Sequence, residues 1–192
     1  MSIRCFIAVE LDESVKTELG RLQKRLAKQL RGDEFGINWV KPERIHLTLK
    51  FLGDVDDTLI PEICSAVSEA AEHFSPFEIE LSGLGCFPPN NRPARVLWAG
   101  ITTGAETLGE LAEAIDLNLG VLDFGPETRK FSPHLTLARI KQPNAGKSVR
   151  NLVEQSPVDI IAGQTVGEIT VFQSELTRSG PIYTSLAHAP LT

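Results

Sequence analysis

The sequence predicts an α+β fold: two pseudo-symmetric lobes with largely antiparallel sheets flanked by helices, and a cleft between the lobes. Two observations lead to this prediction. Short segments with the alternating apolar pattern of strands are interleaved with longer segments whose apolar residues recur with the period of a helix. In addition, the tetrapeptide His-Leu-Thr-Leu occurs twice in the 192 residues, at 46–49 and at 134–137.

The spacing of the repeated segments predicts a single bilobal domain, residues 1–192, formed by an internal duplication. The first strand patterns of the two halves start at residues 3 and 95, which are 92 positions apart. The two tetrapeptides start at residues 46 and 134, which are 88 positions apart. Because the two offsets nearly agree, we expect equivalent halves at approximately 1–90 and 91–192.

The first half is expected to begin with a strand, a helix and the strand that carries the first tetrapeptide. The apolar run at 3–9 predicts a buried strand. Asp12 is placed to cap the next helix and Gly32 to end it. After a turn at 41–44, the segment 45–53 alternates like a strand. Apolar residues recur at spacings of three and four along the helix: Val15, Leu19, Leu22, Leu26 and Leu30.

The rest of the first half predicts a helix, a strand and a loop. The helix begins near Asp57, with Pro61 in its first turn. A strand follows at 77–81, and the prolines at 86–94 predict a loop. One face of the helix is apolar: Ile63, Val67, Ala70 and Phe74.

The second half repeats this order. A strand is predicted at 95–101, and Thr103 is placed to cap the helix that follows. The second tetrapeptide opens a strand at 134–140, and a helix is expected near 145–155. The apolar residues of the helix after Thr103 share one face: Leu108, Leu111, Ile115 and Leu119. The chain is expected to finish with strands near 166–176 and 182–187.

The charge balance limits how the protein can bind nucleic acid. The formal net charge is -6 at pH 7, which argues against a broad basic face for duplex nucleic acid. A small anionic group can still be held in a local basic pocket. Positive residues near the tetrapeptides or between them either form such a pocket or are solvated surface charges: Lys41, Arg44, Lys50, Arg92, Arg95, Arg129, Lys130 and Arg139.

The cysteines and the apolar segments predict a cytoplasmic protein that does not enter a membrane. Cys5, Cys64 and Cys86 form no Cys-x-x-Cys pair, so we expect small buried apolar residues rather than a disulfide framework or a zinc site. The beginning of the sequence lacks the layout of a signal peptide. No apolar segment approaches the roughly 18 residues that a membrane-spanning helix needs.

The tetrapeptides themselves place two polar side chains on one face of each strand. Residues two apart in a strand point the same way, so His46 and Thr48 project together while the two leucines face the core. The same holds for His134 and Thr136. A single His-x-Thr is most often structural, but two copies at equivalent places favour a function. His73 and His188 lack a threonine partner, and we expect them to be structural.

Two imidazoles and two hydroxyls suit displacement at phosphorus. This reaction needs a base for the incoming oxygen and an acid for the departing one, and histidine can act as either near neutral pH. The hydroxyls of Thr48 and Thr136 can donate hydrogen bonds to the non-bridging oxygens. Two histidines alone are too few ligands for a zinc site. We therefore expect chemistry that uses neither a metal nor a cofactor.

The sequence resembles the two-histidine phosphoesterase superfamily, and within it the RNA 2′,3′-cyclic phosphodiesterases, also called 2′-5′ RNA ligases. The resemblance rests on the two tetrapeptides and on the segments RCFIAVEL, WVKPERIHLTLKFLG, FPPNNRPARVLWAG, FSPHLTLAR and LTRSGPIYTSLA. It implies hydrolysis of a terminal 2′,3′-cyclic phosphate on RNA to a 2′-phosphomonoester, with reversible 2′-5′ ligation as the related reaction. It also implies His46 as proton donor and His134 as proton acceptor, an order that the residues alone leave open.

Several weaker candidates complete the predicted site. Arg92, Arg129 and Lys130 are expected to bind substrate. Aromatic residues either stack a base or pack in the core: Phe51, Phe131 and Tyr183. RNA ends or nucleoside 2′,3′-cyclic phosphates are the expected partners of a monomer. The alternatives are a non-catalytic protein that binds nucleotides or RNA ends, and a phosphodiesterase for another small 2′-5′-linked or cyclic phosphate.

Overall fold

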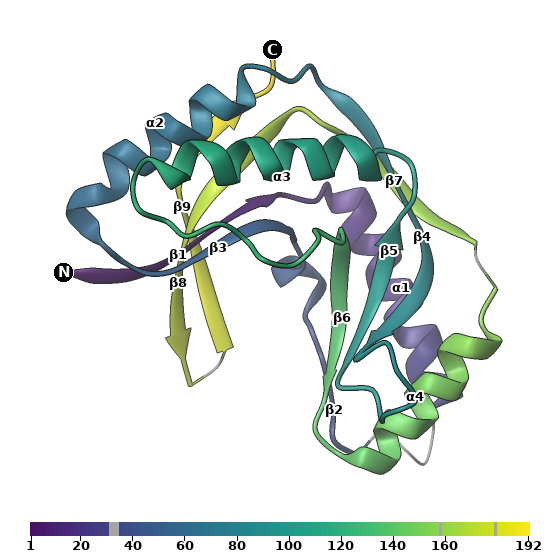
Figure 1. The fold of residues 1–192 in the computed structure, drawn as a ribbon. Helices are drawn as coiled ribbons and strands as arrows, with labels where there is room; N and C mark the ends of the chain where they lie inside the picture. The colour runs from purple at the N-terminus through teal and green to yellow at the C-terminus, as the bar shows by residue number, and fades with distance from the viewer. Residues whose placement is uncertain (31–34, 158, 179) are drawn as a thin grey trace.

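The computed structural model describes residues 1–30, 35–157, 159–178 and 180–192. The described residues form two antiparallel sheets with helices packed on them, so the predicted α+β class is confirmed (Figure 1). The four-stranded sheet has the order β3 (Leu47–Asp56), β1 (Ser2–Val9), β8 (Glu168–Thr177) and β9 (Gly180–Pro190). The five-stranded sheet has the order β2 (Ile37–Trp39), β6 (His134–Ile140), β5 (Val96–Ile101), β4 (Phe77–Phe87) and β7 (Ile160–Val166).

Each sheet takes strands from both halves of the chain, and so do the helices that cover it. Helix α1 (Glu13–Gln29) follows β1 but packs on β7, and α4 (Pro143–Gln155) also packs on the five-stranded sheet. Helices α2 (Ile60–Ala71) and α3 (Ala105–Gly120) lie together over the four-stranded sheet (Figure 1). Consequently the sheet that carries the first tetrapeptide is covered partly by a helix of the second half.

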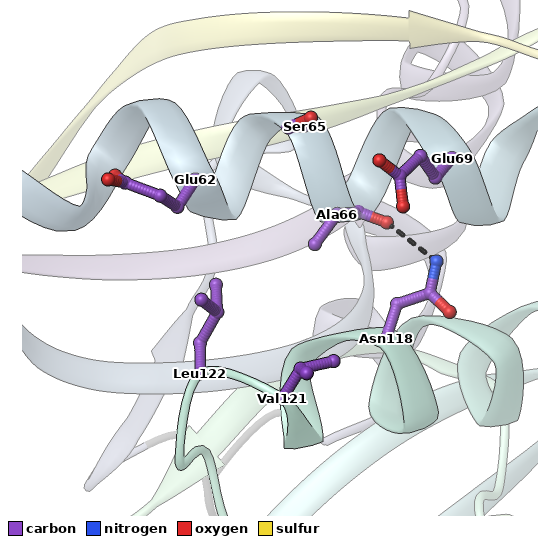
Figure 2. Close-up of a pocket in the computed structure, with 7 residues that line it drawn as sticks. All are labelled: Glu62, Ser65, Ala66, Glu69, Asn118, Val121 and Leu122. Atoms are coloured by element: carbon purple, nitrogen blue, oxygen red, sulfur yellow. Dashed lines mark hydrogen bonds between the residues drawn. The ribbon is translucent and has the colours of Figure 1, made fainter.

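Helices α2 and α3 are joined at the surface by Asn118, whose Nδ2 donates to the carbonyl of Ala66 at 3.1 Å. A shallow hollow lies between the two helices (Figure 2), and its lining is largely acidic or apolar: Glu62, Ser65, Glu69, Val121 and Leu122. The hollow lies on the helical side of the four-stranded sheet. Within the described part of the chain, no helix has the length and apolar character needed to cross a bilayer.

The leucines of both tetrapeptides are buried, as the strand alternation predicts. Leu47 and Leu49 are 0% and 7% exposed, and Leu135 and Leu137 are 0% exposed. They belong to one continuous apolar core that extends between the sheets and the helices. Burial of each such side chain contributes roughly 1.5–3 kcal/mol. The same alternation leaves the histidine and threonine of each copy only partly buried.

Two of the predicted helix caps differ from the structure, and a third prediction falls outside the described residues. Asp12 occupies the N-cap of α1, but its side chain makes no capping hydrogen bond. Thr103 does not cap α3, because Gly104, at φ +76°, takes the N-cap position and Thr103 donates instead to the carboxylate of Glu80. Gly32, expected to end α1, lies outside the described residues.

Several element boundaries also differ. Strand β4 continues past residue 81 to Phe87, because its pairing with β5 extends to Val96, and proline stops the ladder only at Pro88. Helix α2 begins after a single 3-10 turn at Asp57–Leu59 and ends before Phe74. Strand β7 was not predicted: it is an edge strand with little apolar alternation, which pairs with β4.

Candidate active site

The histidine and threonine side chains of both tetrapeptides lie on the sheet face opposite to the buried leucines. In the four-stranded sheet, Thr48 pairs with Ala8, which belongs with Phe6 and Phe172 to a small apolar cluster separate from the main core. In the five-stranded sheet, Thr136 pairs with Trp98. The face that carries the histidines is therefore lined by residues from neighbouring strands.

The strands that carry the two tetrapeptides lie next to each other, although they belong to different sheets. Cα atoms of β3 and β6 come within 8 Å of one another. The backbone N–H of Val40, shortly before the first tetrapeptide, donates to the carbonyl of Leu137 in the second at 2.9 Å. Buried Gln23 of α1 donates from Nε2 to the carbonyls of both Val40 (2.7 Å) and Leu137 (3.0 Å). The two motif segments are thus tied together.

Each histidine ring is held by the same local contact. Nδ1 of His46 lies 3.0 Å from the carbonyl oxygen of Arg44, and Nδ1 of His134 lies 2.7 Å from that of Ser132, in both cases two residues earlier. A carbonyl oxygen can only accept, so Nδ1 carries the proton in the neutral ring and Nε2 keeps its lone pair. Each imidazole can therefore take up or release a proton at Nε2.

Aromatic rings enclose His46. The ring centroid of Phe6 lies 4.7 Å from that of His46, Tyr183 meets it edge-on at 5.0 Å, and Phe172 lies at 6.5 Å. Burial lowers the pKa of His46 to about 4, because the charged imidazolium loses hydration, and the hydrogen bond to Arg44 opposes this only in part. His46 is therefore neutral near pH 7 in the free protein.

His134 has a different aromatic surrounding. Phe87 meets its ring edge-on at 5.1 Å, and Trp98 lies at 6.0 Å. The indole of Trp98 lies directly over Gly85, where an added Cβ would come within 2.1 Å of the ring. Among the described residues, Trp98 Nε1 is a buried donor without a hydrogen-bond partner.

The predicted substrate residues lie in the loops that lead to β6 and to its neighbour β5. Arg92 lies in the loop between β4 and β5, and Arg150 of α4 holds this loop through the carbonyls of Pro88 (2.7 Å) and Arg92 (2.9 Å). Arg129 and Lys130 lie between α3 and β6 and are exposed.

The aromatic candidates have separate environments. Phe51 is 72% exposed and lies 6.1 Å from Phe6 by ring centroids. Tyr183 is edge-on to His46, whereas Phe131 packs against the main core. Phe6, Phe87, Trp98 and Phe172 were not predicted as site residues. Phe6, Trp98 and Phe172 lie in segments predicted as strands, whereas Phe87 lies in the predicted loop at 86–94. The strand pairing that brings these rings to the histidines joins distant parts of the chain.

The remaining candidates have structural contacts. Nδ1 of His188 lies 3.1 Å from Glu168 Oε1 and 3.3 Å from Thr170 Oγ1, and His73 is exposed just after α2. The three cysteines are free; Cys5 and Cys86 are buried, while Cys64 is half-buried. In the part of the chain that the structure describes, no group of three or more His, Cys, Asp or Glu side chains is placed to hold a metal ion.

Comparison with known proteins gives a consistent result. The sequence model of the family described as LigT like Phosphoesterase matches residues 9–98 and 101–183. The RNA 2′,3′-cyclic phosphodiesterase of Methanothermobacter thermautotrophicus is 35% identical over 186 residues, which is 97% of this chain and 97% of that protein. The protein of the same name from Aeropyrum pernix is 38% identical over 169 residues, covering 88% of this chain and 93% of that protein.

Solved structures have the same fold. The crystal structure of TT0787 of Thermus thermophilus is similar, with a TM-score of 0.80 and 30% identity, covering 98% of both chains. The apo form of Escherichia coli LigT has a TM-score of 0.73 at 23% identity, covering 100% of this chain and 98% of that chain.

Proposed function

Because this chain belongs to the LigT like phosphoesterase family, we propose that it is an RNA 2′,3′-cyclic phosphodiesterase that leaves a 2′-phosphomonoester. Relatives that carry this name are 32–38% identical to it over most of its length. The observation that carries the proposal is the matched pair of His-x-Thr segments. The two segments lie on contacting strands, and in each one the histidine Nδ1 is hydrogen-bonded to the carbonyl oxygen of the residue two positions earlier.

In the proposed reaction, a water molecule attacks the phosphorus of the cyclic phosphate and loses its proton to Nε2 of His134. The bond from phosphorus to the 3′ oxygen breaks, and His46 gives a proton from Nε2 to that oxygen. The phosphate stays on the 2′ oxygen. Thr48 and Thr136 donate hydrogen bonds to the non-bridging oxygens, where negative charge is held during displacement.

The role of His46 as donor requires that it gain a proton in the complex, because its pKa in the free protein is about 4. The cyclic phosphate is an anion, and a nearby negative charge favours the imidazolium. Substrate binding is therefore expected to raise the pKa of His46 and load the proton that it then transfers. If a 5′ hydroxyl of a second RNA replaces water, the same displacement forms a 2′-5′ bond.

Arg92, Arg129 and Lys130 are proposed to bind phosphates of the RNA. Arg129 and Lys130 are cations in the segment that leads to the motif strand β6, and Arg92 is a cation in the loop before β5, which pairs with β6. We place the protein in the cytoplasm, where its three free cysteines remain reduced. We also propose that it acts as a monomer, which size-exclusion chromatography with light scattering will test.

The experiment that tests this function measures hydrolysis of a nucleoside 2′,3′-cyclic phosphate in the presence of a chelator. His46→Ala and His134→Ala are each expected to lose roughly 10²–10⁴-fold in kcat, the usual size of a general acid or base contribution. His188→Ala is the matched control and keeps its activity. If the wild type binds the substrate tightly but forms no product, or if both variants remain active, the proposal is wrong.

A further inference from the structure

A buried lysine directly after the first tetrapeptide has no part in the proposed reaction. Simple alternation would place Lys50 on the same face as Thr48, but a bulge in β3 pairs Thr48 with Ala8 and Lys50 with Ile7. The side chain therefore turns towards the helices, where Lys50 is only 8% exposed. Lys50 is therefore not a solvated surface charge, which was one of the two roles predicted for it.

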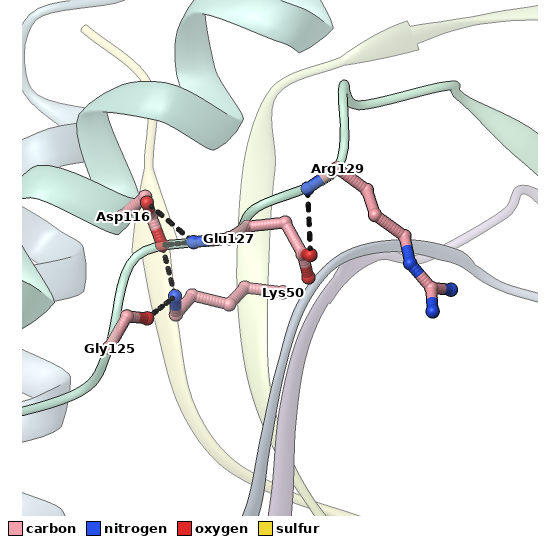
Figure 3. Close-up of polar contacts among 5 residues, drawn as sticks. All are labelled: Lys50, Asp116, Gly125, Glu127 and Arg129. Atoms are coloured by element: carbon pink, nitrogen blue, oxygen red, sulfur yellow. Dashed lines mark hydrogen bonds and ion pairs between the residues drawn. The ribbon is translucent and has the colours of Figure 1, made fainter.

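The ammonium of Lys50 is paired with groups from the second half of the chain. It forms an ion pair with Asp116 of α3 and donates to the carbonyl of Gly125 at 3.2 Å (Figure 3). Buried charges are expensive to desolvate, and an apolar pair is often at least as stable. The pair therefore needs an explanation other than stability.

The contacts continue from Asp116 along the segment that leads to the second tetrapeptide. The carboxylate of Asp116 accepts from the backbone N–H of Glu127 at 3.1 and 3.3 Å. The carboxylate of Glu127 in turn accepts from the backbone N–H of Arg129 at 3.2 Å (Figure 3). At the other end of this segment, the carbonyl of Ser132 accepts from His134. Residues 125–132 are thus fixed between β3 and the second histidine.

The guanidinium of Arg129 takes no part in this network. The network engages the backbone of Arg129, while the side chain extends away from Lys50 and Asp116 (Figure 3). Arg129 is exposed, and no ion pair joins it to another described residue. A guanidinium held on an ordered segment beside both motif strands is suited to bind phosphate, because ordering the segment in advance lowers the entropy cost of binding.

We propose that Lys50 and Asp116 are positioning residues, which hold residues 125–130 so that Arg129 binds a backbone phosphate of the RNA upstream of its cyclic end. The inference rests on the proposed function and adds a specificity to it: longer RNA is favoured over a mononucleotide. The terminal cyclic phosphate is handled by the histidines, so the network affects KM for RNA rather than kcat.

The test compares a nucleoside 2′,3′-cyclic phosphate with a pentanucleotide that ends in one. Lys50→Met combined with Asp116→Leu removes both charges, so that no buried charge is left unpaired. KM for the pentanucleotide is expected to rise about tenfold with kcat within about twofold, the effect of a lost charge-assisted contact. Both constants for the mononucleotide should stay within about twofold of wild type. Arg4→Gln with Asp54→Asn, an exposed pair that joins β1 and β3, is the matched control and leaves KM unchanged.

A double-mutant cycle shows whether the network acts through Arg129. Arg129→Ala alone should reproduce the increase in KM, and adding it to the Lys50/Asp116 variant should give no further increase. Loss of the phosphate contact should also lower the salt dependence of KM by about 0.7 in log–log slope. The inference is wrong if the effects of Arg129→Ala and of the Lys50/Asp116 substitutions on KM multiply. It is also wrong if KM for the pentanucleotide does not change.

Milder variants keep the test valid if the double substitution does not fold. Asp116→Asn keeps an acceptor for the N–H of Glu127 but removes the charge that pairs with Lys50, and it should raise KM for the pentanucleotide by a smaller factor. Lys50→Arg keeps the charge, so KM for the pentanucleotide should stay close to the wild-type value. No change in Asp116→Asn also contradicts the inference. Failure of the proposed function is distinguishable, since the wild type would then not hydrolyse the mononucleotide.

Discussion

The two histidines occupy identical tetrapeptides but differ in what surrounds them. In both copies the leucines are buried and Nδ1 is bonded to a carbonyl two residues earlier. The neighbours are different: three aromatic rings surround His46, whereas Phe87 and Trp98 flank His134. The orientation of each ring is therefore set locally, by a carbonyl two residues before the tetrapeptide. The protonation of His46, with its pKa of about 4, depends on residues far away in the sequence.

The strand order is similar beside the two motif strands. In the four-stranded sheet the motif strand β3 is followed by β1 and β8, and in the five-stranded sheet the motif strand β6 is followed by β5 and β4. In each triplet the third strand comes from the other half of the chain. We propose that the halves are duplicated units that exchanged their later strands and helices.

The largest expected effect separates the chemical roles of the two histidines. A substrate whose departing 3′ oxygen is replaced by sulfur has a leaving group that needs no proton. If His46 is the donor, His46→Ala should lose about 10²–10⁴-fold with the oxygen substrate but less than about tenfold with the sulfur substrate. His134→Ala should lose activity with both, because the water must still be deprotonated. Single-turnover rates on the two substrates measure this difference.

The opposite pattern, in which sulfur restores His134→Ala but not His46→Ala, would exchange the two roles. Equal losses in both variants on both substrates would show that leaving-group protonation does not separate the half-sites. His188→Ala serves again as the control, since its ring is held by Glu168 and Thr170.

A second prediction concerns stability in acid. The pKa of His46 is about 4 in the folded protein and about 6.5 when unfolded, so between these values the unfolded state binds more protons. Neutral His46 makes its full contribution to the free energy of unfolding above pH 6.5, and this contribution is lost as the pH falls towards 4. With solvent access allowed for, this amounts to about 2 kcal/mol. Urea unfolding at pH 7.5 and pH 4.5 should therefore show a smaller difference in His46→Gln than in wild type.

His134→Gln provides the comparison for this measurement. If His134→Gln alters the pH dependence of unfolding as much as His46→Gln does, the aromatic enclosure of His46 does not distinguish the two half-sites. An unchanged pH dependence in His46→Gln would contradict the low pKa itself.

Local patterns were sufficient to predict much of the fold and the placing of the histidines. The strand alternation correctly separated His46 and Thr48 from Leu47, because side-chain direction in a strand depends only on position. Bulges and long-range pairing limited the prediction. Lys50 turns inward at a bulge, and its partner Asp116 lies 66 residues later. No local pattern contains that information.

The aromatic surroundings were not predictable for the same reason. Phe172 and Tyr183 reach His46 from the last two strands, and β8 pairs with β1 across more than half of the chain. Phe87 was assigned to a loop because prolines follow it, although the strand ladder extends to that residue. The sequence therefore indicated which side chains share a strand face, but not the environment that lowers the pKa of His46.

The smallest expected effect tests that environment directly. Phe6 is 3% exposed, and its ring lies 4.7 Å from His46, so Phe6→Leu should let water reach the imidazole. The pKa of His46 should then rise from about 4 by roughly one unit towards its ordinary value. Phe87→Leu makes the same change beside His134 and should leave the pKa of His46 where it is. NMR titration of the imidazole measures both variants, and the acidic limb of kcat/KM should move with it, because kcat/KM reports the free enzyme. If Phe6→Leu leaves the pKa near 4, the enclosing ring is not its cause, and the difference between the half-sites must come from the other strands.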